Sequence, residues 1–176
     1  IAGASWEKIT ASLAEYRGIW RRFEKVGELD GTPIYSDYAH HPSEIRATLQ
    51  AARELYPDRR LIVAFKPHQH NRTKMLWTEF VGAFELANLV ILAEIYDVAG
   101  REEQRDQDVN SRKLVDDIRA HNETQKIHQT VVYQKTNDDV REFLLESVRP
   151  LAPGHPADVV FVMGAGDIDI VARKLV

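Results

Sequence analysis

Short apolar runs, each about as long as a buried strand, alternate along this chain with stretches of helical periodicity. The runs lie at 61–65 (LIVAF), 89–93 (LVILA) and 159–163 (VVFVM), and TVVY at 130–133 is a further candidate. A continuous apolar run of this kind is typical of a strand buried on both faces of a parallel sheet. Because strands that alternate with helices are joined by right-handed crossovers, the order predicts an α/β fold: a Rossmann-like, mostly parallel sheet with helices on both faces.

The intervening helices are predicted from apolar residues spaced three or four apart. These residues are Ile45, Leu49, Ala52 and Leu55; Leu76, Phe80, Ala83 and Phe84; Leu114, Val115 and Ile118; Val140, Phe143, Leu144 and Val148; and Ile168, Val171, Ala172 and Leu175. Pro42 suits the first turn of the first helix, which should stop before Pro57. Asn71 is expected to cap the second helix and Asp167 the last, and the helix of Val140 should end near Pro150.

The first part of the chain has a different pattern. An apolar stripe predicts an amphipathic helix that stops at Gly18, and its members are Trp6, Ile9, Leu13 and Tyr16. Two extended stretches then flank Asp30-Gly31, a dipeptide that favours a tight turn, so we expect an N-terminal antiparallel hairpin. The polar segment 97–110 is expected to be a long loop.

Composition limits the classes of function. The chain has 176 residues, which fits one domain over 1–176, and no apolar run approaches the roughly 20 residues of a membrane span. The 23 basic residues against 27 acidic ones give a net charge of −4, so general nucleic-acid binding is not expected. The absence of cysteine excludes disulfides, thiolate zinc sites and cysteine catalysis. Since the chain starts at Ile1 without an initiator Met, we expect it to be an excised fragment.

Two loops that follow predicted strands carry the chemistry. SDYAHHP at 36–42 comes directly after the hairpin, and KPHQHNRT at 66–73 follows LIVAF; together they hold four of the seven histidines. In sheets of this kind, ligands bind beyond the carboxyl ends of the strands. Nearby helix N-termini add unpaired N–H donors, so the two loops form an environment that favours anions.

Three interpretations of these loops compete. The histidines could only cap helices; they could bind zinc through His40, His41, His68 and His70; or Arg72 could hold a carboxylate or phosphate while His and Tyr side chains hold an amine or nucleotide. The last is favoured, because no acidic residue stands at helical spacing beside His68 and His70. No GxxxxGK[ST] motif occurs and Gly164-Ala165-Gly166 lacks a third glycine, so a bound triphosphate would need another domain.

Five motifs occur in the order found in one known family. They are GxxRRFE at 18–24, DYAHHP at 37–42, PHxxxRT at 67–73, EIY at 94–96 and GAGDI at 164–168. With these motifs the whole chain resembles the carboxy-terminal domain of the Mur ligase family, in the branch that joins L-alanine to UDP-N-acetylmuramate. A related branch, which attaches whole peptides during recycling, is the nearest alternative.

The resemblance implies a cytoplasmic, three-domain enzyme of peptidoglycan biosynthesis, of which this chain is the amino-acid-binding part and residues 1–17 an interdomain helix. In that family ATP phosphorylates the lactyl carboxylate of UDP-N-acetylmuramate. The amine of L-alanine attacks the acyl phosphate and gives an amide, ADP and phosphate. ATP and Mg²⁺ are held mainly by a central domain, so the resemblance implies no catalytic residue and no metal site in this domain alone, and the isolated fragment should be inactive.

The resemblance also assigns residues. It implies that Arg22 and Asp37 touch ATP, and that the amino acid is surrounded by Tyr38, His40, His68 and Arg72. One departure concerns the position after His68, where relatives commonly have Arg and then Tyr, whereas this chain has Gln69 and His70. Lys66 likewise stands where Gln is usual. The amino-acid site is therefore expected to include Gln69 and a single guanidinium.

Two other classes remain open from the residues alone. One is a stand-alone, non-catalytic module that binds an amino acid or a nucleotide, and the other is a hydrolase with a histidine-bound metal. An upstream GxxxxGK[ST] domain in the parent gene would argue against the first, and stoichiometric metal in purified protein would support the second.

Overall fold

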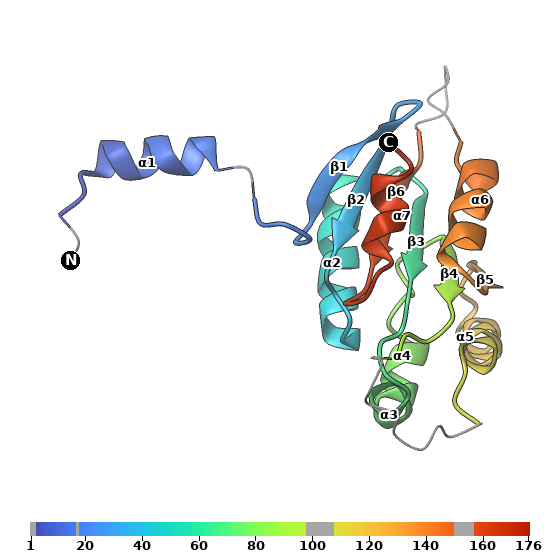
Figure 1. Cartoon of the computed structure of the whole chain (residues 1–176). Coiled ribbons are helices and arrows are strands. Elements are labelled where there is room, and N and C mark those ends of the chain that lie inside the picture. The colour runs from blue at the N-terminus through green and yellow to red at the C-terminus, as the bar shows by residue number, and fades with distance from the viewer. Residues whose placement is uncertain (1–2, 17, 98–107, 150–156) are drawn as a thin grey trace.

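The computed structural model describes residues 3–16, 18–97, 108–149 and 157–176 (Figure 1). Its strands are β1 (Glu24–Leu29), β2 (Thr32–Asp37), β3 (Leu61–Phe65), β4 (Leu89–Ala93), β5 (Thr130–Gln134) and β6 (Val159–Met163). Its helices are α1 (Trp6–Glu15), α2 (Pro42–Leu55), α3 (His70–Met75), α4 (Trp77–Val81), α5 (Ser111–Gln125), α6 (Asn137–Ser147) and α7 (Asp169–Arg173).

The strands form one six-stranded sheet in the order β1-β2-β6-β3-β4-β5. All neighbouring strands are parallel except β1 and β2, which form the antiparallel hairpin at one edge. Asp30 and Gly31 at its turn have φ of 49° and 79°. Two successive positive φ values match the twist of the flanking strands, which is why Asp-Gly suits this turn. The predicted fold class is confirmed.

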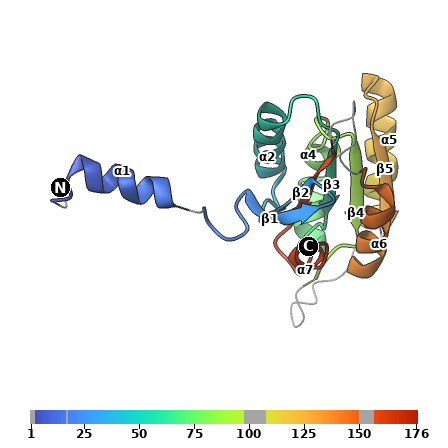
Figure 2. The ribbon, with the colours of Figure 1, turned by 90° about the horizontal axis from the view of Figure 1, so that it is seen from above.

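Each face of the sheet carries its own core. Leu61, Val63 and Phe65 of β3 point to one face, which packs against α2, α4 and α5. Ile62 and Ala64 point to the other, which packs against α6 and α7. Figure 2, seen from above, shows these helices on the two sides of the sheet. The central strands are therefore apolar at every position, because neither face is exposed to water.

One residue of the predicted core of α2 is exposed. Ile45, Leu49 and Ala52 are fully buried, whereas Leu55 is 56% exposed and the expectation for it was wrong. Leu55 lies ten residues after Ile45, which falls short of three full turns. Tyr56 completes those turns, and its side chain packs against the core instead.

Two predicted helix caps were also wrong. Instead of one helix capped by Asn71, the structure has the short helices α3 and α4, and α3 begins at His70 after Gln69, whose φ is 68°. Asp167 does not cap α7, which starts after Ile168 without a side-chain cap. Both errors arise because the side chain expected to cap lies elsewhere: Asn71 is inside α3, and the Asp167 carboxylate pairs with Lys66. Most of the predicted loop 97–110 and Pro150 lie outside the described residues.

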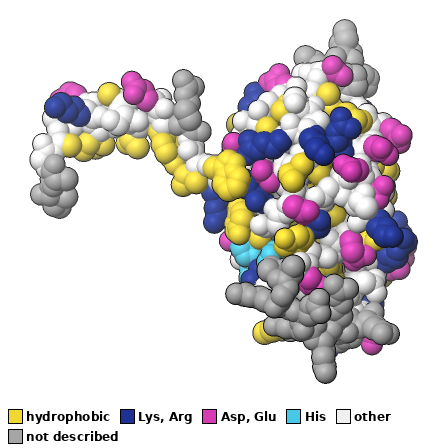
Figure 3. Space-filling view, viewed as in Figure 1, with side chains coloured by type: hydrophobic (Ala, Val, Ile, Leu, Met, Phe, Trp, Pro, Cys, Tyr) yellow, Lys and Arg dark blue, Asp and Glu magenta, His cyan; other side chains and the backbone are white. Residues whose placement is uncertain are grey.

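A helix forms in the N-terminal segment as predicted, but it ends at Glu15, before the predicted stop at Gly18, and it buries none of its residues. Its Trp6 and Leu13 side chains are 71% and 66% exposed. Figure 1 shows α1 projecting away from the sheet, and Figure 3 shows hydrophobic side chains along one of its sides. The interdomain role of residues 1–17 stays a prediction. Within the described ranges, no helix combines the length and the apolarity needed to cross a membrane.

Candidate active site

The two loops singled out from the sequence meet at the carboxyl edge of the sheet. Backbone pairing continues beyond the strands: Gly164 N–H donates to Asp37 O at 3.1 Å, and Lys66 N–H donates to Met163 O at 3.2 Å. Tyr96, which follows β4, donates its N–H to Pro67 O and accepts from Gln69 N–H, both at 2.8 Å. The loops after β2, β3, β4 and β6 are therefore held side by side.

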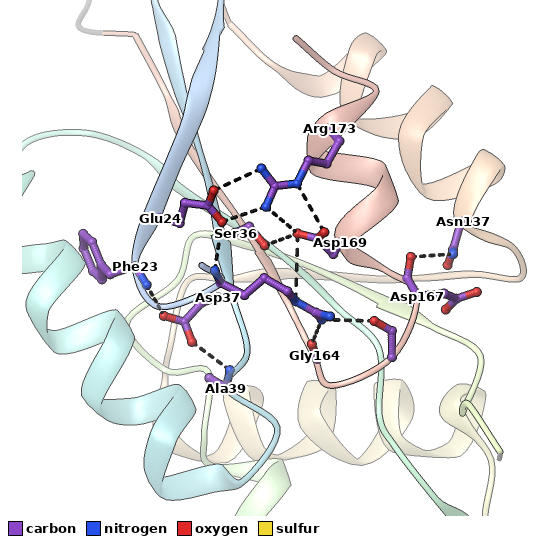
Figure 4. Close-up of polar contacts among 12 residues, drawn as sticks. Phe23, Glu24, Ser36, Asp37, Ala39, Asn137, Gly164, Asp167, Asp169 and Arg173 are labelled. Carbon is purple, nitrogen blue, oxygen red and sulfur yellow. Dashed lines mark hydrogen bonds and ion pairs between the residues drawn. The ribbon is translucent and has the colours of Figure 1, made fainter. Parts of the chain in front are cut away.

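Asp37 fastens the first of these loops. Its carboxylate accepts hydrogen bonds from Ala39 N–H at 2.7 Å and from Phe23 N–H at 2.8 Å (Figure 4). Burial raises the pKa of Asp37, although these two hydrogen bonds act in the opposite direction. Both oxygens already bind backbone amides, so contact with ATP by Asp37 stays a prediction that would add to this structural role.

The two adjacent arginines point in different directions. The buried guanidinium of Arg21 donates to the carbonyls of Gly164 and Gly166 and thereby holds the turn after β6. Arg22 is half-exposed, 3.9 Å from a Glu44 oxygen and 5.5 Å from the centre of the Tyr38 ring. Of the two arginines, Arg22 is therefore the one exposed to solvent. The role of Arg21 was missed, because the sequence of two neighbouring arginines does not tell which one points inward.

A second network surrounds Arg21 on its other side. Glu24 accepts from the Arg21 N–H at 2.8 Å and from Arg173 at 2.7 Å, and Arg173 also contacts Asp169 at 3.3 Å (Figure 4). The Ser36 hydroxyl donates to the same Asp169. These contacts tie β1 and β2 to α7. They fix the strand ends that carry the site without contributing to it.

Tyr38 and His40 lie on the loop after β2 and contact each other. Their rings meet edge to face with centroids 5.3 Å apart, and His40 Nδ1 lies 3.1 Å from the Tyr38 carbonyl and 3.3 Å from a Glu44 oxygen. The Glu44 carboxylate also accepts the N–H groups of His40 and His41, while the His41 side chain accepts from Ser43 N–H and caps α2. The helix cap therefore fixes the orientation of His40.

His68 and Arg72 lie on the segment that follows β3. The His68 ring stacks on Tyr96 with centroids 5.5 Å apart, and its Nδ1 is buried without a partner among the described residues. Burial, together with the charges on Arg72 and His40, lowers the pKa of His68, so its imidazole is uncharged near neutral pH. The half-buried guanidinium of Arg72 forms no hydrogen bond or ion pair within the described part of the chain.

The departures from the family pattern have distinct surroundings. The Gln69 carbonyl accepts from the Thr73 N–H at 3.0 Å and from its hydroxyl at 2.9 Å, which starts α3. Lys66 is occupied, since its Nζ lies 2.7 Å from Asp167 and 3.1 Å from Asn137. His70 Nδ1 lies 2.8 Å from Asp97 Oδ1, a pair that sequence reasoning missed because 27 residues separate its members.

Glu94 organises the far side of this edge. Its carboxylate accepts from the Tyr133 hydroxyl at 2.7 Å and from Ile95 N–H at 3.0 Å. Burial alone would raise the pKa of Glu94, but these bonds and one from the Ser111 backbone outweigh it, so the pKa is lowered. Glu94 thus joins the end of β4 to the start of α5 and to β5, and its oxygens are engaged in structure.

The zinc interpretation finds no support in this geometry. Over the described residues, no group of three or more His, Asp or Glu side chains is arranged to hold a metal ion. Instead, His41 caps a helix, His70 pairs with Asp97, and His68 lies close enough to Arg72 and His40 for their charges to lower its pKa in addition to burial. Figure 3 shows histidine side chains next to basic and hydrophobic ones, near the junction with the α1 segment.

Comparison with known proteins identifies relatives over nearly the whole chain. The profile of a family described as "Mur ligase, glutamate ligase domain" matches residues 21–166. The UDP-N-acetylmuramate–L-alanine ligase of Nitratidesulfovibrio vulgaris is 38% identical over 99% of this chain and 36% of its own length. That of Trichlorobacter lovleyi is 38% identical over 93% of this chain and 33% of its own. The chain thus spans about a third of these relatives.

Solved structures agree on the fold. A UDP-N-acetylmuramate-alanine ligase from Thermotoga maritima has a TM-score of 0.70 at 22% identity and covers 98% of this chain and 33% of its own. A murein peptide ligase from Psychrobacter arcticus has a TM-score of 0.67 at 21% identity and covers 98% of this chain and 32% of its own. At these identities the likeness concerns the fold alone.

Proposed function

The chain belongs to the Mur ligase family, and on that premise we propose that it is the amino-acid-binding, carboxy-terminal domain of an ATP-dependent, amide-forming ligase of peptidoglycan biosynthesis. The substrates we propose for the full-length enzyme are L-alanine, UDP-N-acetylmuramate and ATP. The curated relatives that match most of the chain carry the name of this ligase, which supports the choice of L-alanine.

The observation that carries the proposal is the open guanidinium of Arg72 at the carboxyl edge. A planar guanidinium matches a carboxylate with two parallel hydrogen bonds, and here it has no competing partner among the described side chains. The neighbouring His68 is uncharged near neutral pH, so it can share the site with the ammonium group of an amino acid without repelling it.

In this proposal the remaining site residues orient the amine. Tyr38, His40 and His68 surround it, and the Gln69 amide adds a neutral donor to the carboxylate held by Arg72. The amine then attacks the acyl phosphate that ATP has formed on UDP-N-acetylmuramate, and C–N bond formation expels phosphate. Holding the amine and the acyl carbon together is the main contribution of the domain, because correct positioning alone can supply several kcal/mol of the barrier.

Contact with ATP is proposed for Arg22 and Asp37 when the domains close. The half-exposed Arg22 can reach a phosphate, whereas Asp37 can act by holding the segment of Arg22, before β1, next to the loop of Tyr38, after β2. The described residues at this edge do not fit Mg²⁺, which prefers free carboxylate oxygens and water. The carboxylates of Asp37 and Glu94 are engaged with other groups, so no step is assigned to a metal here.

The test compares amine substrates. Purified full-length enzyme should release phosphate from ATP only when UDP-N-acetylmuramate and L-alanine are both present. Faster turnover with the tripeptide L-alanyl-γ-D-glutamyl-diaminopimelate would favour the peptide-recycling branch, and glycine or L-serine measures how selective the single guanidinium is. Binding of L-alanine without any turnover would favour a non-catalytic module.

The isolated 176-residue chain should have no ligase or ATPase turnover, because no motif in it can cradle a triphosphate. Phosphate release by this chain, measured with ATP and Mg²⁺ against a protein-free control, checks the expectation. Steady hydrolysis above the control would contradict it.

A further inference from the structure

The His70–Asp97 pair joins the segments that follow β3 and β4, adjacent in sequence to residues of the proposed site, and has no role in the proposal so far. His70 is the first residue of α3, two positions before Arg72, and Asp97 directly follows Tyr96, on which His68 stacks. The two side chains are only 18% and 27% exposed. A carboxylate at Nδ1 holds the proton on that nitrogen, so the lone pair of a neutral imidazole is left on Nε2.

The charge of the pair decides between two roles. Because Gln69 replaces an arginine common in relatives, His70 could supply the missing positive charge for the substrate carboxylate. A protonated His70 would, however, lie 2.8 Å from the negative Asp97, and the pair would carry no net charge. Such a pair attracts a carboxylate weakly. It is well suited to accept a proton, since Asp97 stabilises the imidazolium that forms.

We propose that His70, oriented by Asp97, is the general base that deprotonates the ammonium group of the incoming amino acid. The inference rests on the proposed function. His70 Nε2 takes one ammonium proton, and the freed amine lone pair forms the C–N bond to the acyl carbon. The bond between that carbon and the phosphate oxygen breaks, and the departing phosphate takes the second amine proton. His70 then returns its proton to water. His70 is the catalytic residue and Asp97 a positioning residue.

Charged and titratable groups lie on each of the segments next to the pair. They are Glu94 after β4, His68 and Arg72 on the β3–α3 segment, His40 before α2, and Arg112 of α5, whose guanidinium stacks on the ring of Tyr133. Because these groups include both signs of charge, the test asks only whether the break in the pH–rate profile disappears when His70 is replaced.

The experiment uses the full-length enzyme and two nucleophiles. L-Alanine must lose a proton before it can attack, whereas hydroxylamine is already uncharged at neutral pH and traps the acyl phosphate as a hydroxamate. His70→Gln should lower kcat with L-alanine by about 10²- to 10⁴-fold and remove the acid-side break from its pH–rate profile. Hydroxamate formation should stay within about twofold of wild type, because that reaction needs no base.

Two further variants complete the test. Asp97→Asn keeps a hydrogen-bond acceptor but removes the charge, so kcat with L-alanine should fall less than in His70→Gln, while hydroxamate formation stays near wild type. His121→Gln is the matched control, because His121 of α5 forms a similar 2.8 Å pair with Glu85 in the turn after α4. It should leave both reactions and the pH profile unchanged.

Several results would overturn the assignment. One is a His70→Gln enzyme whose kcat with L-alanine equals that of wild type. Another is an equal loss of rate with L-alanine and with hydroxylamine, which indicates a structural defect. The third is a raised KM for L-alanine at unchanged kcat, which indicates that His70 contacts the carboxylate. A wild-type enzyme that forms hydroxamate but no alanine product would be recognised before any variant is made. It would overturn the proposed substrate, and the base assignment with it.

Discussion

Replacing Gly164 with alanine should destabilise the fold at the turn that Arg21 holds. Gly164 has a φ of 144°, which residues with a Cβ rarely adopt and which costs of order 1–3 kcal/mol. A Cβ there would lie 2.9 Å from the Lys66 carbonyl oxygen and 3.2 Å from Ile168 Cγ2. This carbonyl belongs to the backbone directly after β3, which is hydrogen-bonded to the end of β6 and cannot rotate away. Overpacking therefore adds about 1–3 kcal/mol. The expected loss is about 2 to 6 kcal/mol.

Urea unfolding of the 176-residue chain, followed by circular dichroism, measures this loss. With a urea m-value of about 2 kcal/mol/M, the midpoint should fall by about 1 to 3 M. The lost free energy is a large part of the roughly 5–15 kcal/mol that stabilises an ordinary domain. Gly82→Ala is the matched control: Gly82 has a φ of −95°, and its Cβ would meet nothing closer than a Glu85 side-chain oxygen at 3.5 Å. It should stay within about 0.5 kcal/mol of wild type. If Gly164→Ala did the same, the close approach of the two loops would be wrong.

Four further variants, with Arg46→Ala as a control, test the site and the residues that support it. In the full-length enzyme Arg72→Ala should raise the KM for L-alanine about 10- to 150-fold, whereas Asp37→Ala should change the KM for ATP more than that for L-alanine. Replacing the exposed Arg46 with alanine should change neither KM. Steady-state kinetics with each substrate varied in turn measures these constants, and an unchanged KM for L-alanine in Arg72→Ala would contradict the assignment. Gln69→Arg should lower that KM about fivefold by adding a second guanidinium, and a rise in KM with an intact fold would show that the carboxylate lies elsewhere. Because the folded-state pKa of Glu94 is lowered, its contribution to stability is present above its ordinary pKa of 4.5 and is lost as pH falls through the folded value. Glu94→Gln should therefore weaken the acid dependence of unfolding, and urea midpoints at several pH values that fall equally steeply in both proteins would refute this.

The arrangement of the site explains why some of these variants should change kinetics and others stability. Residues that touch the proposed substrate, such as Arg72, have few partners in the fold, whereas Arg21 and Glu94 are hydrogen-bonded on several sides. Loss of the first kind should change kinetics at nearly constant stability. Loss of the second kind should change stability first.

The sequence alone determined the strands and the faces of most helices. A run such as LIVAF has only one stable location, because five adjacent apolar side chains must be buried on both faces of a sheet. The carboxyl edge followed from the same argument, so the two histidine-bearing loops could be predicted to meet there. The motifs at 37–42 and 67–73 could indicate the family because each consists of residues that are close together in the sequence.

Only the tertiary structure decided matters that depend on partners distant in sequence. Periodicity does not order the strands, and β6 lies between β2 and β3 although it comes last in the chain. Of the two adjacent arginines, Arg21 points inward because its guanidinium donates hydrogen bonds to the carbonyls of Gly164 and Gly166. These acceptors lie more than 140 residues later in the sequence. The His70–Asp97 pair likewise joins the start of α3 to the segment after β4, and α3, α4 and β4 lie between the two residues in the sequence. A hydrogen bond specifies its partner by position in space, and that position exists only once the sheet has brought the loops together.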